Sequence, residues 1–198
     1  MSTQPHLNKL RKDKFIFVLT LPPVLRKLNS KTARQQQLLN LDSLQFSLYD
    51  FAVPTITVPE HQIHYAGQNH NVTGYDRPPY PPLTLNFEVD NEYKNYWVIW
   101  KWLQLFNDPL NAMYGSKDMF PNGYPEQQPN LVVDYATTMY AYILDEYNNK
   151  KVKITYKHAF PTALGELQFS YRDAEQLQSS ATIVYNQLDI DLLQPGEE

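Results

Sequence analysis

Cysteine is absent from this 198-residue sequence, and glycine occurs only six times. Without cysteine there is no disulfide, no thiolate metal ligand and no cysteine nucleophile. We therefore expect a protein that folds in a reducing compartment and is stabilised by packing alone. Glycine-rich phosphate loops, serine nucleophile elbows and Cys/His clusters are missing too, so neither an enzyme nor a bound cofactor is predicted.

Long apolar runs are also missing. A membrane-spanning helix needs about 20 apolar residues, whereas the longest run here, KFIFVLTLPPVL, is interrupted by Pro22 and Pro23. No signal peptide is recognisable at the start of the chain. The sequence therefore predicts a soluble protein without a membrane partner.

Basic residues are scarce beyond the first part of the chain. Residues 1–34 hold eight basic residues and one acid, Asp13, whereas the remainder holds nine basic and 20 acidic residues. The acidic character of the chain beyond residue 34 argues against nucleic-acid binding, because contacts with phosphates need clustered lysine and arginine. The basic segment 1–14, with the basic residues that follow it to 34, is either a tether to DNA or to an acidic partner, or a solvated, partly helical arm.

Aromatic residues are plentiful, at 14% of the chain with 15 tyrosines. Tyrosine suits half-buried strand faces, and alternation of apolar with polar residues predicts strands. The strands are expected at residues 14–21, 44–53, 83–90, 135–145, 150–160, 167–173 and 180–193. We expect a mainly β protein, a single domain over 1–198 in which a β-sandwich or barrel carries one packed helix.

One helix is predicted, at residues 91–109. Apolar residues recur there at helical spacing, and Asp90 or its neighbour can cap the start. We expect Trp100 to face the core, whereas Trp97 and Trp102 are harder to place. A helix that is apolar on several sides is buried on several sides, which in a small domain indicates a neighbouring subunit.

Three segments fall outside this core pattern. Residues 55–76 form two extended arms around a turn near Gly67-Gln68-Asn69, and Pro59 keeps the first arm out of a central sheet position, so we predict a projecting hairpin. Residues 24–42 form a polar insert that holds one or two short helices or a loop. Residues 108–130 show no sustained period and predict a long loop.

Histidines and carboxylates form two patterns that could carry chemistry. His61 and His64 stand three apart in an extended segment, so their side chains point to opposite faces and suit surface roles better than zinc binding. Asp189 and Asp191 share a strand face, but no base or nucleophile lies near them in the sequence. We therefore predict neither a metal site nor a catalytic site.

The stretch HAFPTALGELQFSY, residues 158–171, places a proline and a glycine four residues apart between two strand-like runs. Such a short step fixes two strands rigidly, and Gly165 suits either a positive φ angle or a close backbone approach. We predict a structural corner formed by Pro161, Thr162, Gly165 and Glu166.

The segment FPTALGELQFSYRDAEQLQSSATIVYNQLDIDLL resembles the C-terminal signature of the tail tube proteins of contractile-tailed, T4-like myoviruses. In that family an aromatic-Pro-Thr step leads into a Gly-Glu-Leu strand, an acidic turn and a closing strand. The matching residues are Phe160, Pro161, Thr162, Gly165, Glu166 and Leu167. FAVPTITVPEHQIHYAGQNHNVTGYDR and LTLNFEVDNEYKNYWVIWKWL resemble the family more loosely, so the resemblance covers residues 43–106 and 135–193.

This resemblance implies a structural subunit of the phage tail. Six copies would form a ring in which each sheet joins its neighbours' sheets into an inner β-barrel, and the hairpin would stack one ring on the next. The candidate inter-ring hairpin residues are Thr57, Glu60, His61, His64 and Gln68. The lumen would carry viral DNA and the tape measure protein, and an acidic wall would repel the phosphates. The candidate lumen-facing acids are Glu88, Asp189 and Asp191.

The implied partners are further copies of the chain, the tail sheath, and the baseplate or neck rings, in a virion tail assembled in the host cytoplasm. The chain is either the major tube subunit or a tube-like baseplate, tube-initiator or neck ring protein, because its insert and long loop exceed what a minimal tube subunit needs. A tube protein of a related contractile injection system is a further alternative. A carbohydrate-binding β-sandwich module, suggested by the tyrosines and tryptophans, is an alternative from a different class.

Overall fold

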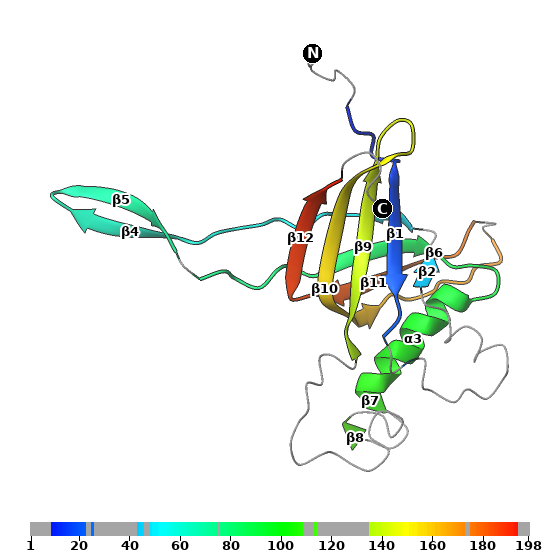
Figure 1. Cartoon of the computed structure of the whole chain (residues 1–198). Helices are drawn as coiled ribbons and strands as arrows, with labels where there is room; N and C mark the ends of the chain where they lie inside the picture. The colour runs from blue at the N-terminus through cyan, green and yellow to red at the C-terminus, as the bar shows by residue number, and fades with distance from the viewer. Residues whose placement is uncertain are drawn as a thin grey trace.

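Two packed β-sheets carry one helix and a hairpin that projects far from the body in the computed structural model (Figure 1). The structure describes residues 9–22, 25, 43–45, 48–74, 76–108, 113–114, 135–172 and 175–193. The predicted insert 24–42 and the predicted loop 108–130 lie largely outside the described residues.

The described elements agree with a mainly β fold. The first strands and the helix are β1 Phe15–Thr20, β2 Ser43–Gln45, β3 Leu48–Phe51, β4 Glu60–Tyr65, β5 Gln68–Thr73, β6 Leu83–Glu88 and α3 Lys94–Phe106. They are followed by β7 Asn107–Asp108, β8 Met113–Tyr114, β9 Thr137–Leu144, β10 Lys150–Leu164, β11 Gln178–Val184 and β12 Gln187–Leu192.

The long strand β10 belongs to both sheets. Its first part pairs with β9 and β12, and its last part pairs with β11. The hydrogen-bonded order is β2-β1-β9-β10-β11-β6-β3, with β12 on the remaining edge of β10. We call β1, β9, β12 and the first part of β10 the front sheet, which faces the viewer in Figure 1, and β3, β6, β11 and the end of β10 the back sheet.

β10 changes sheets at His158. The register of β10 against β9 shifts between Tyr156 and Ala159, and His158 adopts a positive φ of 56°. An extra residue in one strand bends that strand and increases its twist. β10 continues through Pro161 to Leu164, and its register against β11 shifts between Pro161 and Ala163, within the predicted corner. The strand therefore has an irregularity at the predicted place and a second one, at His158, where it changes sheets.

Three strand predictions are wrong. The single strand predicted at 44–53 is two strands, β2 paired with β1 and β3 paired with β6 in the other sheet. Residues 167–172 form no strand and run as an extended loop. The single strand predicted at 180–193 is two strands, β11 in the back sheet and β12 in the front sheet. The chain crosses between the sheets at Tyr185 and Asn186, where the Asn186 N–H donates to the Lys157 carbonyl at 3.1 Å. The alternation of apolar and polar residues looks the same in one long strand as in two shorter strands that follow each other in the sequence.

Replacing His158 with glycine is expected to raise the free energy of unfolding by up to about 1 kcal/mol. The left-handed conformation costs an L-residue about 1–2 kcal/mol, and the larger conformational entropy that glycine loses on folding offsets about 0.5–1 kcal/mol of that gain. Urea unfolding measures the change. His158→Ala is the matched control and should bring no gain, because alanine keeps the Cβ. A glycine variant that is less stable than the alanine variant would contradict this account of the bend.

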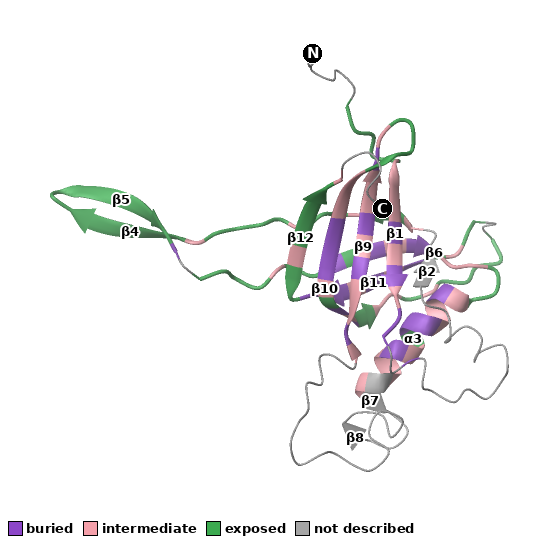
Figure 2. Ribbon diagram, viewed as in Figure 1, coloured by how far each residue is buried: buried purple, intermediate pink, exposed green. Residues whose placement is uncertain are grey.

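One core fills the space between the two sheets and extends to α3 (Figure 2). Alternate residues of β1, β6, β9, β10 and β11 point inward, as their strand period requires. The largest fully buried side chains include Phe87, Tyr156, Leu19, Leu85 and Met139. Burial raises the pKa of the neighbouring Tyr185 to about 12, so its phenol stays neutral inside this core.

The predicted helix is confirmed, but a different tryptophan enters the core. Trp102 is 1% exposed and its indole Nε1 donates to the Tyr135 carbonyl at 2.9 Å, whereas Trp100 is 44% exposed. At the start of α3 the Asp90 carboxylate accepts a hydrogen bond from the Lys94 N–H at 2.8 Å, which is the predicted capping contact. The face of the helix that packs against the core carries Val98, Ile99 and Trp102.

Candidate functional site

The projecting hairpin consists of β4 and β5, in which every residue is exposed (Figure 2). Tyr65 pairs with Gln68, so the turn has two residues, Ala66 at φ 52° and Gly67 at φ 76°. Two positive φ angles are typical of the type I′ turn, whose twist matches that of a hairpin. The turn predicted near Gly67-Gln68-Asn69 is present, but it consists of Ala66 and Gly67, and Gln68 and Asn69 already belong to β5.

The hairpin has one apolar and one polar face, because paired residues of antiparallel strands share a side. The apolar face carries His61, Ile63, Tyr65, Gln68, His70 and Val72. The polar face carries Glu60, Gln62, His64, Asn69, Asn71 and Thr73.

The structure divides our predicted hairpin residues between these two faces. His61 and Gln68 lie on the apolar face, whereas Glu60 and His64 lie on the polar face, where the His64 imidazole Nδ1 is 2.6 Å from Asn69 Oδ1. Thr57 lies before the first strand, in the extended arm. The sequence analysis missed the apolar side chains themselves, although the alternation of Gln62, Ile63, His64 and Tyr65 already signalled them.

The base of the hairpin is closed by Gly74. Its N–H donates to the Pro59 carbonyl at 2.6 Å, and a Cβ on this glycine would stand 2.9 Å from the same oxygen. Only glycine allows the two arms to approach so closely. The base thus fixes where the two strands begin to pair.

The apolar face has no partner among the described residues of its own chain. Ile63 is 51% exposed and Tyr65 is 72% exposed. An isolated two-stranded hairpin is at best marginally stable in water, and an exposed apolar patch on an extended arm marks an interaction site. The geometry therefore suits an arm that docks on another molecule.

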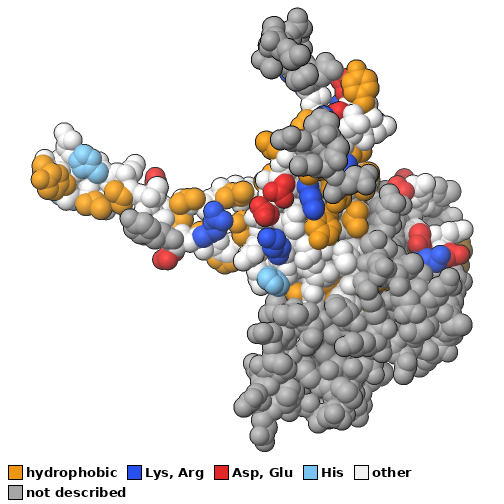
Figure 3. Space-filling view, viewed as in Figure 1, with side chains coloured by type: hydrophobic (Ala, Val, Ile, Leu, Met, Phe, Trp, Pro, Cys, Tyr) orange, Lys and Arg blue, Asp and Glu red, His pale blue; other side chains and the backbone are white. Residues whose placement is uncertain are grey.

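The outer face of the front sheet carries charges of both signs (Figure 3). The Lys157 Nζ lies 3.5 Å from Asp189 Oδ2, and the Lys153 Nζ lies 4.9 Å from the centroid of the Tyr140 ring. Since Lys153 pairs with Asp191 in register, lysines of β10 run beside the aspartates of β12. This face is therefore not uniformly acidic.

The predicted lumen-facing acids do not share a surface. Asp189 and Asp191 lie on the outer face of the front sheet, whereas Glu88 lies at the end of β6 in the back sheet. The amide of Gln176, oriented to satisfy both groups, donates to Glu88 Oε1 at 2.8 Å. Alternation within each strand was interpreted correctly, but the sequence does not tell which sheet a strand joins.

β12 is an edge strand of the front sheet. Its described pairing is with β10 alone, and Leu192 on its inner side is 80% exposed. An open edge offers unpaired N–H and C=O groups to another chain. This edge is the second surface, after the hairpin, that is suited to assembly.

Gly165 joins three elements just after β10. Its N–H donates to the Ser180 carbonyl at 2.6 Å, and its own carbonyl accepts from the Tyr96 hydroxyl and the Ser179 hydroxyl, both at 3.3 Å. A Cβ here would stand 2.7 Å from Ser180 Oγ and 2.9 Å from Ser180 N. Of the two reasons we gave for a glycine here, the close backbone approach is the one observed.

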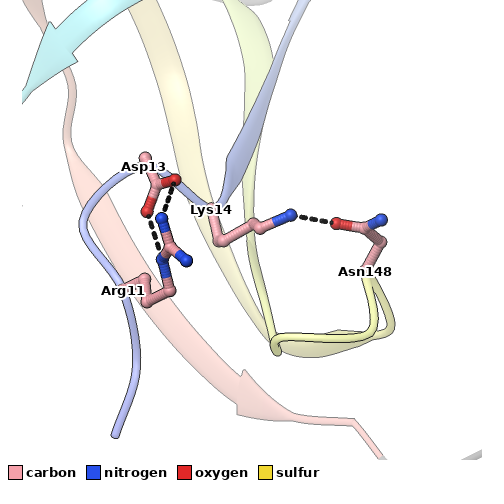
Figure 4. A network of polar contacts seen from close by, with 4 residues as sticks. All are labelled: Arg11, Asp13, Lys14 and Asn148. Carbon is pink, nitrogen blue, oxygen red and sulfur yellow. Dashed lines mark hydrogen bonds and ion pairs between the residues drawn. The ribbon is translucent and has the colours of Figure 1, made fainter.

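The described part of the basic N-terminal segment leads into the first strand (Figure 4). Two hydrogen bonds from the Arg11 guanidinium, at 3.0 and 2.9 Å, lower the pKa of the Asp13 carboxyl. The Lys14 Nζ donates to Asn148 Oδ1 at 2.7 Å in the turn before β10. These contacts are exposed, so they position the start of β1 rather than form a binding site.

Neither a metal site nor a membrane span emerges from the residues that the structure describes. They hold no group of three or more histidines or acids arranged to bind a metal ion. None of their helices combines the length and the apolar character that crossing a membrane requires.

Solved structures similar to this chain include tube and terminator components. The anti-feeding prophage tube-terminating cap matches with a TM-score of 0.55 and 15% identity, over 98% of this chain and 95% of that one. The sheath/tube terminator of the extracellular contractile injection system PVC, in the extended state, matches with a TM-score of 0.53 and 10% identity, over 94% and 99%. A chain of the PVC sheath–tube complex matches with a TM-score of 0.52 and 10% identity, over 95% of each. At these identities the likeness shows the fold alone.

Sequence comparison gives the family itself. No curated protein sequence matches the chain. The sequence model described as "Phage tail tube protein" matches residues 10–190, which is nearly the whole chain. The chain therefore belongs to the phage tail tube protein family, whose members are structural proteins and not enzymes.

Proposed function

We propose that this chain is a structural subunit of a phage tail tube, which assembles into stacked hexameric rings and forms the conduit for DNA ejection. The observation that carries the proposal is the amphipathic hairpin, whose apolar face is exposed on an arm that extends away from the body. Such an arm gains stability only by lying against another molecule. The open edge of β12 supplies the second surface, because closing the sheets into a ring removes free strand edges.

The proposed lumen is a passage for DNA and the tape measure protein, not a specific binding site. Lysines and aspartates stand side by side on the outer face of the front sheet. If this face lines the lumen, its mixed charge neither strongly attracts nor strongly repels the phosphates of the DNA. The tail sheath would surround the tube, baseplate or neck rings would adjoin its ends, and the virion tail would assemble in the host cytoplasm.

Electron microscopy of the purified full-length chain, combined with native mass spectrometry, tests this function. We expect six-fold rings of six times the 23.2 kDa chain mass, or hollow tubes built from them. A chain that stays monomeric at all concentrations, with and without preformed tube, would contradict the proposal. Binding of glycans by such a monomer would favour the carbohydrate-binding alternative.

A tube-terminating or neck ring is the second candidate. The anti-feeding prophage cap and the PVC terminator both share this fold over nearly their whole length. Such a ring would cap existing tubes without polymerising, so single rings in the microscope would favour it and long tubes would favour the major subunit.

Replacing both Ile63 and Tyr65 with serine is expected to prevent ring stacking without lowering the stability of the body. Both side chains are exposed on the apolar face, so their loss removes contacts only in the assembly. Tube yield in electron micrographs and the urea midpoint of the unassembled chain measure the two effects. The matched control, Gln62→Ser with Asn71→Ser on the polar face, should assemble normally. Equal losses from both pairs would show that the apolar face has no special role.

A further inference from the structure

A groove lies between the loop that follows β10 and the segment that leads into β11. Its volume is about 460 Å³, and it is lined by Glu166, Phe169, Glu175 and Leu177 among others. Phe169 is 77% exposed on its rim. The groove therefore combines an uncovered aromatic ring, an aliphatic side chain and two carboxylates.

The groove and the hairpin lie on opposite sides of the molecule. In Figure 1 the hairpin extends to the left of the sandwich, whereas the orange loop that borders the groove lies to its right. A contact between two different surfaces of identical chains is heterologous, and it propagates into a closed ring or a filament. Contacts of this kind can join each copy to the next, around a ring or along a filament.

The hairpin tip is chemically complementary to the groove. Tyr65 stands beside the turn, with an apolar ring to pack on Phe169 and a hydroxyl that can donate to a carboxylate. His70 pairs with Ile63 on the same face and offers further N–H donors. The hairpin's one carboxylate, Glu60, lies on the polar face, away from this contact.

The two carboxylates of the groove are open to such donors. Within the described part of the chain, no lysine or arginine forms an ion pair with Glu166 or Glu175. Glu166 accepts one hydrogen bond, from the exposed Gln168 amide at 2.8 Å, and a carboxylate has room for several. A buried tyrosine with its hydroxyl bonded to a charged acceptor is a common anchor of protein interfaces.

We propose that the hairpin tip of one copy docks in this groove of the next copy. The Tyr65 ring packs against Phe169, and its hydroxyl donates to Glu166 or Glu175. This inference rests on the proposed function, because it names the receiving surface of the assembly arm. It assigns the groove residues a role in assembly that neither the strand pattern nor the tube fold requires.

The absence of cysteine allows a direct test by site-specific cross-linking. Gln68→Cys stands on the apolar face beside Tyr65, and Gln168→Cys stands at the groove; both positions are exposed. The two single-cysteine variants are mixed, assembled and treated with a short bis-maleimide. We expect most cross-linked dimers to join position 68 to position 168, as identified by peptide mass spectrometry. Tyr147→Cys, exposed in the turn before β10, replaces Gln168→Cys as the control and should give no such product.

The outcomes separate this proposal from the proposed function. Rings or tubes that form without a 68–168 cross-link, or with 68–68 cross-links in its place, would overturn the groove assignment and leave the tube function standing. Failure of the unmodified chain to assemble, alone or on preformed tube, would overturn both.

Discussion

Replacing Trp102 with alanine is expected to lower the free energy of unfolding by about 3–5 kcal/mol, the usual cost of deleting a large buried aromatic side chain. Trp102 is 1% exposed and packs with Val98 and Ile99 in the core. Its indole also donates to the Tyr135 carbonyl, so the change leaves that oxygen without its partner. Urea unfolding of the unassembled chain, followed by circular dichroism, measures the loss.

Trp100→Ala is the matched control on the same helix. Because Trp100 is 44% exposed and lies outside the core cluster, its removal should lower stability by about 1 kcal/mol or less. Trp102→Phe gives an intermediate case, since it keeps an aromatic ring but loses the hydrogen bond to Tyr135. Equal losses from Trp100→Ala and Trp102→Ala would contradict the observed orientation of the helix. A Trp100→Ala variant that is stable but fails to assemble would support our expectation that the helix also faces a neighbouring subunit.

Replacing Gly165 with valine is expected to cost about 2–4 kcal/mol of stability, from overpacking and a broken hydrogen bond, and to abolish assembly. The new side chain would overlap Ser180, which contacts this glycine through both its side chain and its backbone. The end of β10 must then separate from β11, and the contact of Gly165 with Tyr96 of the helix is lost. Urea unfolding and electron microscopy measure the two effects.

The control for this change is Ala163→Val, two residues earlier. Ala163 is exposed in β10, and β-branched residues suit strands, so stability should stay within about 0.5 kcal/mol. Normal tubes formed by the Gly165→Val variant would refute the idea that this junction sets the register needed for assembly. Our prediction of a structural corner at Pro161–Glu166 would then lose its functional part.

The resemblance in the sequence identified the protein family correctly. Residues 160–167 form an aromatic-Pro-Thr step followed by Gly-Glu-Leu, and the family match extends over residues 10–190. The ring, the stacking and the lumen were implied by this resemblance and stay predictions. Their tests are the micrographs and cross-links described above.

The sequence by itself determined those features that depend on neighbouring residues in the chain. Alternation in β1, β6 and β9, the capping of α3 by Asp90, and the two-residue turn at Gly67 all follow from local backbone and side-chain preferences. The projecting hairpin follows as well, because proline and polar residues exclude its arms from a sheet interior.

Tertiary structure alone decided which surfaces these elements form. The alternation of apolar and polar residues looks the same in a straight strand and in β10, which bends at His158. It also looks the same in β11 and β12, which follow each other in the sequence but belong to different sheets. Three tryptophans within six residues leave the buried face of a helix undecided until the sheets pack against it. The residues that line the groove assigned to the hairpin tip all lie within 166–178, but the strands on either side of this stretch are held by the pairing of β11 with β10 and with β6. Those pairings join residues that are distant in the sequence, which local preferences do not encode.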